Sequence, residues 1–338
     1  MSKPTRRSLL AGAAALTFAP ALRAAPTDDF AAARDAAAAL DQLHSLTIAV
    51  DGETRLAEAL RGPGLDAVVN VMSVSKTLVA TLAGIAIDRG ALPGPDATLG
   101  DLAPVLSPRG ADARVRAITV GDLMTMRAGL ERTSGGNYGA WVASADWVAD
   151  ALARPMVAAP GAEMLYSTGS YHVLGAVLKE VTGQSLHALA NDWLAAPLGF
   201  RFAPWTRDPQ GRYMGGNNMA MRPSELLRFG EMIRRGGVWD GTRVVSGDWI
   251  LRALMPRTVS RFSGDQYGYG WFLREMGGHH AHYARGYGGQ MLYVVPSLRL
   301  SVVITSDNGR PARSDGHQGA LNELVEEHVI PAAEALVS

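Results

Sequence analysis

Strand-like patterns lie at the two ends of this chain, and helix patterns fill its middle. Near the start, residues 43–59 read as a hairpin, because Asp51-Gly52 between two apolar stretches is a strong signal for a tight turn. Further strand patterns lie in the last quarter, over 267–275, 279–283, 290–295 and 298–305. We therefore expect one sheet built from both ends of the chain, with a helical insertion between them.

The helix patterns are each bounded by glycine or proline. The most apolar one is predicted over Ser73–Arg89, with Gly90 as its C-terminal cap. A shorter helix is expected from Thr119, because Asp122 three residues later completes an N-cap signal. Residues 91–118 are rich in proline and glycine and are expected to be mostly loop. Other helices are predicted over 26–41, 144–153, 170–182, 184–195, 223–235 and 319–335.

The first 25 residues have the pattern of an export signal. Paired arginines, Arg6-Arg7, precede an apolar run over 9–19 and then small residues up to Ala25. This arrangement is typical of the twin-arginine route, and the run is too short to span a bilayer. Cleavage is expected after Ala21 or Ala24. We therefore expect a periplasmic or secreted protein with no stable membrane anchor once the signal is removed.

Composition excludes several classes of function. The 338 residues are 47% hydrophobic and 19% charged, which is typical of a globular protein rather than a disordered one. Basic and acidic residues both number 32, and cleavage after Ala24 leaves 28 basic against 32 acidic residues, so nothing favours nucleic-acid binding. The absence of cysteine excludes disulfides, thiolate nucleophiles and Cys-ligated zinc.

The sequence Ser73-Val74-Ser75-Lys76 opens the apolar helix. Positions i and i+3 share one face of a helix, so the Ser73 hydroxyl and the Lys76 amine can meet. Apolar surroundings disfavour a charged ammonium and so lower the pKa of the amine, which allows the neutral amine to act as a base. In the first helical turn the N–H of Ser73 is also free to stabilise an oxyanion. The alternative is a capping serine beside an incidental lysine, but only three of the 32 basic residues are lysines, which favours a catalytic pair.

Two other segments are candidates for the same site. Tyr166 lies in a loop just before an apolar helix, and a phenol near a cationic lysine can titrate low enough to relay a proton. The glycine-rich segment 285–290 lies between two strands, where its backbone can approach a ligand closely. A packing tyrosine and a plain hairpin turn are the respective alternatives.

The order of these motifs resembles the serine β-lactamase and penicillin-binding superfamily, in which S-x-x-K is the first motif. The chain is most similar to the class C β-lactamase-related esterases, peptidases and amide hydrolases. Segments 118–130, 236–241 and 283–305 also resemble parts of that family. The resemblance implies an α/β (α+β) fold, with an antiparallel sheet flanked by helices. It also implies a sheet domain of residues 26–95 and 225–338, a mostly helical domain of residues 96–224, and an active site between them.

The resemblance also implies roles for individual residues. Ser73 would be the acylated nucleophile, Lys76 its base or proton partner, and Tyr166 a second acid/base that protonates the leaving group. Backbone N–H groups of Ser73 and Tyr287 would form the oxyanion hole. No cofactor or metal is implied, and the partner would be a small ester, amide or peptide. The residues expected to bind substrate are Thr168, Arg285, Gly286 and Gly288.

Two departures from the family pattern bear on the substrate. Tyr166-Ser167-Thr168 replaces the Tyr-x-Asn of lactamases and transpeptidases, so the amide group that grips a substrate amide is missing. Ala284-Arg285-Gly286 replaces Lys-Thr-Gly, although Arg285 can bind a carboxylate if it points inward. We therefore expect an exported serine hydrolase of small esters or amides, similar to the esterase and 6-aminohexanoate-oligomer hydrolase branch. A D-amino-acid peptidase or a β-lactamase is the alternative within the fold.

Two functions of other classes compete with this interpretation. A metal hydrolase would use His279, His280 and His282 with an acid such as Asp307, but no helical H-E-x-x-H pattern supports it. A non-catalytic, penicillin-binding-like protein would keep the fold without the chemistry. The intact set of serine, lysine and tyrosine argues against that loss.

Overall fold

A computed structural model describes residues 28–337 of the chain. The predicted export signal, residues 1–25, therefore lies outside the described residues. Among the residues described, no helix is long and apolar enough to cross a membrane.

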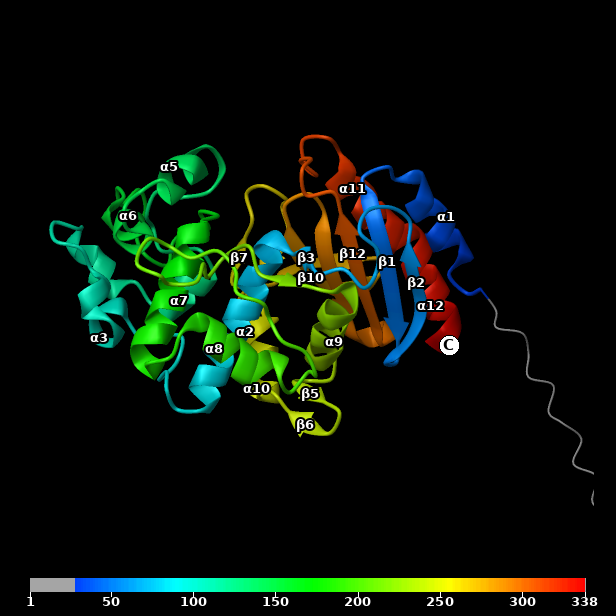
Figure 1. The fold of residues 1–338 in the computed structure, drawn as a ribbon, viewed down its shortest axis with the longest axis horizontal. Helices are drawn as coiled ribbons and strands as arrows, with labels where there is room; N and C mark the ends of the chain where they lie inside the picture. The colour runs from blue at the N-terminus through cyan, green and yellow to red at the C-terminus, as the bar shows by residue number, and fades with distance from the viewer. Residues whose placement is uncertain (1–27, 338) are drawn as a thin grey trace, which may run out of the picture.

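One eight-stranded sheet joins the two ends of the chain (Figure 1). The first and last long strands, β1 (Leu43–Val50) and β12 (Leu300–Ser306), pair antiparallel, and every other neighbouring pair in the sheet is antiparallel too. This confirms the predicted fold class and the sheet built from both termini. The strand order is β2 (Glu53–Ala59), β1, β12, β11 (Gln290–Val295), β10 (His279–Gly286), β9 (Phe272–Met276), β8 (Gln266–Tyr267) and β7 (Thr258–Val259).

The predicted hairpin turn is confirmed between β1 and β2. Asp51 and Gly52 both have positive φ, 52° and 86°, as a two-residue turn that follows the sheet twist requires. At the centre of the sheet, every residue of β11 and β12 is buried, because helices cover both faces. These strands therefore form the middle of the hydrophobic core.

The two faces of the sheet are covered by helices from different parts of the chain. On one face lie α1 (Ala31–Ala39) and the C-terminal helices, and Asn322 of α11 (His317–Leu324) accepts a hydrogen bond from Tyr293 of β11 at 2.9 Å. On the other face α9 (Pro223–Arg234) packs on β11 and β12. The C-terminal helix predicted over 319–335 is interrupted by a wider turn, Val325–Val329, before α12 (Ile330–Val337).

The buried helix α2 (Ser75–Asp88) runs between the sheet and a group of helices from the middle of the chain (Figure 1). The predicted capping box of Thr119 and Asp122 is present at the start of α4 (Val120–Met124). Residues 91–118 contain more helical turns than expected, including α3 (Leu99–Leu102). The helices α5 (Tyr138–Val142) and α10 (Gly247–Ala253) were not predicted. The middle helices and α10 are α3 (Leu99–Leu102), α4 (Val120–Met124), α5 (Tyr138–Val142), α6 (Trp147–Ala153), α7 (Thr168–Thr182), α8 (Leu186–Leu189) and α10 (Gly247–Ala253). Short strand pairs are formed by β3 (Val69–Asn70) with β4 (Ala220–Met221) and by β5 (Val238–Trp239) with β6 (Thr242–Arg243).

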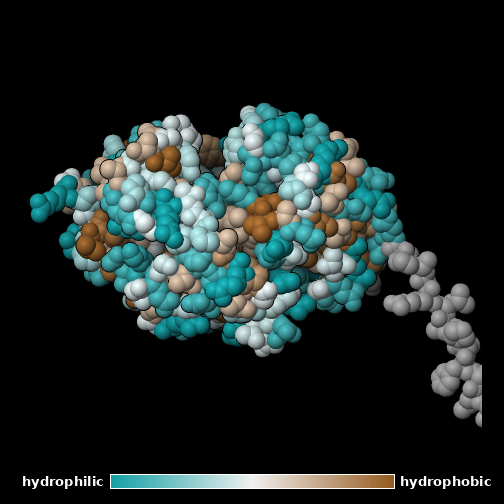
Figure 2. All heavy atoms as spheres, viewed as in Figure 1, coloured by the Kyte–Doolittle hydropathy of each residue, from teal (hydrophilic) through white to brown (hydrophobic). Residues whose placement is uncertain are grey.

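The surface seen in the same view is mostly hydrophilic, with apolar residues scattered over it (Figure 2). It is notched at the top of the view, between the middle helices and the part of the molecule that holds the sheet. The predicted domain boundaries, with an active site between the two parts, stay a prediction.

Candidate active site

Ser73 lies in a tight turn just before α2 rather than in the helix itself. The predicted helix start is therefore wrong by two residues, because Met72–Val74 form a 3-10 turn and α2 begins at Ser75. Met72 has a positive φ of 51°, and its N–H donates to Asn70 Oδ1 at 2.8 Å. Ser75 fixes the turn from within the helix, because its hydroxyl donates to Met72 O at 2.6 Å and accepts from Met219 N at 3.1 Å.

Lys76 is buried one helical turn below Ser73, with 2% of its surface exposed. Its Nζ lies 2.9 Å from Ser73 Oγ, 3.2 Å from Thr168 Oγ1 and 2.7 Å from Gly216 O. Burial lowers the pKa of the Lys76 amine, although the nearby Tyr166 partly offsets this. The serine–lysine pair predicted from the S-x-x-K spacing is thus in contact, in surroundings that favour the neutral amine.

Tyr166 approaches the same pair from the loop before α7. The centroid of the Tyr166 ring lies 5.0 Å from Lys76 Nζ, and the Tyr166 hydroxyl hydrogen-bonds with Ser73. Burial alone would raise the pKa of Tyr166. The charge of Lys76, the Ser73 hydrogen bond and the charge of Arg285 outweigh burial, and they hold the pKa below its usual value. The pKa values of Lys76 and Tyr166 are therefore both lowered, which suits two neighbouring groups that act as bases.

Thr168 is buried next to the lysine. Its Oγ1 contacts Lys76 and also lies 3.0 Å from Ser134 Oγ, which in turn accepts from Thr168 N at 2.9 Å. This hydroxyl is thus used to hold the lysine, and its predicted contact with substrate stays a prediction. Sequence reasoning missed Ser134 and Gly216, although the pair Gly215-Gly216 is a signal of close backbone packing.

The end of β10 lies against the turn that carries Ser73. A Cβ on Gly286 would come within 2.3 Å of Val71 O, so only glycine allows this approach. Tyr287, which follows directly, leaves its backbone N–H free. Across residues 28–337, neither this N–H nor that of Ser73 donates a hydrogen bond. Two free donors on adjacent segments are what an oxyanion hole requires.

Arg285 and Gly288 occupy different surroundings beside this strand end. The Arg285 guanidinium lies 4.4 Å from the centroid of the Phe272 ring, and its positive charge reaches Tyr166. The side chain therefore lies over the neighbouring strand β9, close enough for its charge to lower the pKa of Tyr166. A Cβ on Gly288 would lie 2.5 Å from Asn308 Cα, so Gly288 packs against the chain after β12.

The histidines of the metal-hydrolase alternative lie elsewhere. His279 hydrogen-bonds with Ser297 and Glu334, at 2.9 and 2.8 Å, and His280 pairs with Glu275. Within residues 28–337, no group of three His, Asp or Glu side chains is placed to hold a metal. The three histidines therefore do not converge.

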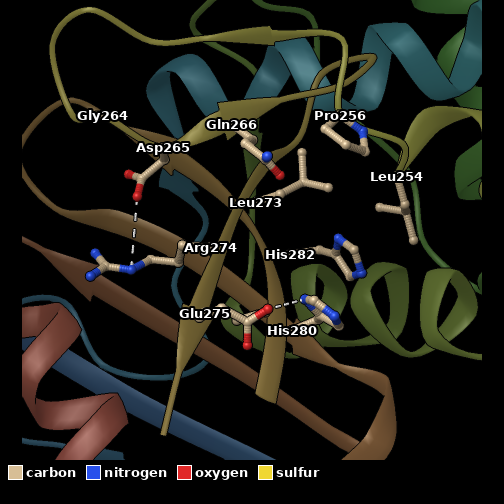
Figure 3. A pocket seen from close by; sticks show the side chains of 11 residues that line it. Leu254, Pro256, Gly264, Asp265, Gln266, Leu273, Arg274, Glu275, His280 and His282 are labelled. Atoms are coloured by element: carbon tan, nitrogen blue, oxygen red, sulfur yellow. Dashed lines mark ion pairs between the residues drawn. The ribbon is translucent and has the colours of Figure 1, made fainter. Parts of the chain in front are cut away.

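A groove of about 590 Å³ lies on the sheet around His280 and His282 (Figure 3). Burial, with a smaller contribution from His280, lowers the pKa of His282 to about 4, so its ring is neutral at physiological pH. Neither Ser73, Lys76 nor Tyr166 lines this groove, so it is separate from the serine site. Its other lining residues are Leu254, Pro256, Gly264, Asp265, Gln266, Leu273, Arg274, Glu275 and Ala281.

Comparisons with known proteins identify a family and several relatives of this chain. The family described as "Beta-lactamase" matches residues 33–326. Penicillin-binding protein 4 of Amycolatopsis lactamdurans is 28% identical over 329 residues, which cover 78% of this chain and 80% of that protein. Among solved structures, a proposed 6-aminohexanoate-dimer hydrolase from Bacillus anthracis has a TM-score of 0.71 at 15% identity, covering 88% of this chain and 80% of its own. A family VIII carboxylesterase has a TM-score of 0.67 at 20% identity, covering 88% and 97%.

Proposed function

This chain belongs to the β-lactamase family, and on that premise we propose that it is a serine hydrolase that forms an acyl-enzyme on Ser73. The observation that carries the proposal is the 2.9 Å contact between Ser73 Oγ and a buried amine. A neutral amine has two N–H donors and one lone pair. Thr168 Oγ1 and Gly216 O accept from the two donors, which leaves the lone pair for the serine hydroxyl.

Acylation follows from this arrangement. Ser73 Oγ attacks the carbonyl carbon of the substrate while its proton passes to Lys76 Nζ or, through it, to Tyr166 Oη. The carbonyl oxygen becomes an oxyanion between the N–H groups of Ser73 and Tyr287. When the tetrahedral intermediate collapses, the bond to the leaving group breaks and Tyr166 supplies the proton that this group needs.

Deacylation reverses these roles with water as the nucleophile. Tyr166, deprotonated after the first half-reaction, takes a proton from water as the oxygen attacks the acyl carbon. The second tetrahedral intermediate uses the same two N–H groups. Its collapse releases the acid and returns the proton to Ser73 Oγ. The lowered pKa of Tyr166 supports this step, because the phenolate is the required base.

We expect activated short-chain esters to be turned over far better than β-lactams. A β-lactam also needs groups that hold its side-chain amide and its carboxylate, and Thr168 and Ala284 lack the usual forms of both. Each lost polar contact costs on the order of 1–3 kcal/mol, so two lower efficiency by a factor of tens to thousands. The measurement is kcat/KM for a p-nitrophenyl ester against nitrocefin, after subtracting spontaneous hydrolysis of each.

Nitrocefin turnover that matches the ester would contradict this substrate preference. Arg285 would then be the replacement for the missing ammonium, because its guanidinium is the nearby cation. In that case Arg285→Ala should remove lactam activity and spare ester activity. A protein that turns over neither class and labels with no serine-directed probe would instead be a binding protein.

We also propose that the protein is exported by the twin-arginine route, on the evidence of Arg6-Arg7 and the apolar run that follows. In a host with a working twin-arginine system, the full-length protein should lose 21 to 25 residues and reach the periplasm. Arg6-Arg7→Lys-Lys should keep it in the cytoplasm. Fractionation and mass spectrometry check this, and unchanged export of the variant would point to the general secretory route.

A further inference from the structure

His172 of α7 is a fully buried histidine that the proposed chemistry does not use. Its Nε2 lies 3.1 Å from Asp208 Oδ2, and both side chains are 0% exposed. Its Nδ1 accepts a hydrogen bond from the backbone N–H of Gly215 at 3.4 Å. Since Nδ1 accepts, the ring must carry its proton on Nε2 and donate it to the Asp208 carboxylate.

Asp208 is itself fixed by the hairpin that leads to the two glycines. Its Oδ1 accepts from Arg212 N at 2.7 Å, and its Oδ2 lies 3.2 Å from Arg212 Nη1. Burial would raise the pKa of Asp208, but the hydrogen bonds from His172 and Arg212 outweigh it and lower the pKa. The carboxylate is therefore charged when it holds the histidine ring in one tautomer and one orientation.

The segment Gly215-Gly216 lies directly on the first turns of α7. A Cβ on Gly215 would be 2.1 Å from Tyr171 O, and one on Gly216 would be 2.9 Å from Thr168 O. This close approach brings Gly216 O to within 2.7 Å of Lys76 Nζ. Gly215, whose N–H donates to His172, is thus the direct neighbour of Gly216, whose carbonyl accepts from Lys76.

Aromatic rings close off the histidine from solvent. The rings of Trp141 and Trp147 lie edge-on to His172, with centroids 5.8 and 5.5 Å away. Both indole N–H groups donate elsewhere, to Trp147 O and Val142 O. If His172 Nδ1 were removed, the Gly215 N–H would lose the acceptor that it uses.

We propose that His172, oriented by Asp208, is a positioning residue for Lys76. Through the Gly215 N–H it fixes the Gly215-Gly216 backbone, and so fixes the carbonyl that holds the amine against Ser73. The inference rests on the proposed function, in which Lys76 accepts the serine proton. The pair touches neither substrate nor reacting atoms, so it should act on kcat and on the pH dependence while leaving KM for a small ester nearly unchanged.

Two amide variants test the roles of the two ring nitrogens of His172 separately. In His172→Asn the side-chain amide oxygen occupies the place of Nδ1, so this variant keeps an acceptor for Gly215, whereas His172→Gln keeps only the donor to Asp208. We expect His172→Gln to lower kcat for a p-nitrophenyl ester by about ten- to a hundredfold, the scale of a small misplacement of a catalytic group. His172→Asn should retain activity close to that of the wild-type enzyme.

A plot of kcat/KM against pH supplies a second readout. Its acid limb, the rise in rate as Lys76 loses its proton, reports the pKa of this amine. Because Gly216 O accepts from the amine and favours its charged form, loosening this carbonyl should lower the Lys76 pKa. The limb should then move to lower pH in His172→Gln and stay in place in His172→Asn. Equal losses in both variants with an unmoved limb would show that His172 only supports the fold, and would overturn the inference.

A measurement on the wild-type protein covers the case in which a variant does not fold. Ring ¹⁵N shifts of His172 should report the Nε2–H tautomer with an unprotonated Nδ1, as the hydrogen bond from Gly215 N–H requires. A proton on Nδ1 would overturn the inference, because Gly215 N–H could not then donate to it. Failure of the proposed function is distinct, since the wild-type enzyme would then neither hydrolyse esters nor react with a fluorophosphonate.

Discussion

Ser73→Ala should abolish ester hydrolysis, with kcat/KM falling by at least about a thousandfold, while the protein stays folded. Removal of a nucleophile costs orders of magnitude in rate, because the acyl-enzyme can no longer form. Ser73 is only partly buried, and replacing its hydroxymethyl group with a methyl changes little volume. Steady-state kinetics and thermal unfolding, measured on the same preparation, check both parts of this expectation.

Ser75→Ala is the matched control, because Ser75 lies two residues away in the same motif. Its hydroxyl bridges Met72 O and Met219 N, so its loss should cost about 1–3 kcal/mol of folding free energy. It should nevertheless leave covalent labelling of the enzyme in place. If Ser73→Ala lost only a few-fold in rate, or if Ser75→Ala lost labelling instead, the assignment of the nucleophile would be wrong.

Lys76→Arg should be nearly as damaging as Lys76→Ala, with about 10²- to 10⁴-fold lower kcat, the range typical of a lost general base. A guanidinium stays protonated and cannot accept the serine proton. It is also larger than the buried space, in which Lys76 Nζ already contacts Ser73, Thr168 and Gly216. The measurement is kcat for a p-nitrophenyl ester over a pH series.

Lys179→Arg provides the control for this substitution. Lys179 is exposed in the last turn of α7, and it is the other lysine of the described chain. We expect its replacement to leave activity unchanged. If Lys76→Arg also kept most of the wild-type rate, Lys76 would be an electrostatic or structural residue and the base would have to be another group.

Most of the fold was predictable because its signals are local. The Asp51-Gly52 turn depends on neighbours along the chain and was predicted correctly. The single strand predicted over 267–275 was wrong, because β8 (Gln266–Tyr267) and β9 (Phe272–Met276) are separate strands that pair antiparallel. The start of α2 was misjudged because the turn before it depends on contacts far away in sequence. Met72 adopts a positive φ in a turn that Met219 helps to close through Ser75.

The contact between Ser73 and Lys76 was predictable for the same reason. The place of Tyr166 beside them was expected only from the family resemblance, and the groups that hold the lysine were not predicted. The spacing of Ser73 and Lys76 directly implies contact on one helical turn. Gly216 meets Lys76 across 140 positions of sequence, and nothing in either segment indicates this pairing. Ser134 meets Thr168 across 34 positions. His172 looked like any helical residue, because its partner Asp208 lies in a separate hairpin.

The assignment of Ser73 as nucleophile is the central claim, and a fluorophosphonate probe tests it most directly. The probe should attach to the protein in a single covalent step, and peptide mapping by mass spectrometry should place the adduct on Ser73. Labelling should disappear in Ser73→Ala and persist in Ser75→Ala. An adduct on another residue, or no adduct in an enzyme that still hydrolyses esters, would contradict the account.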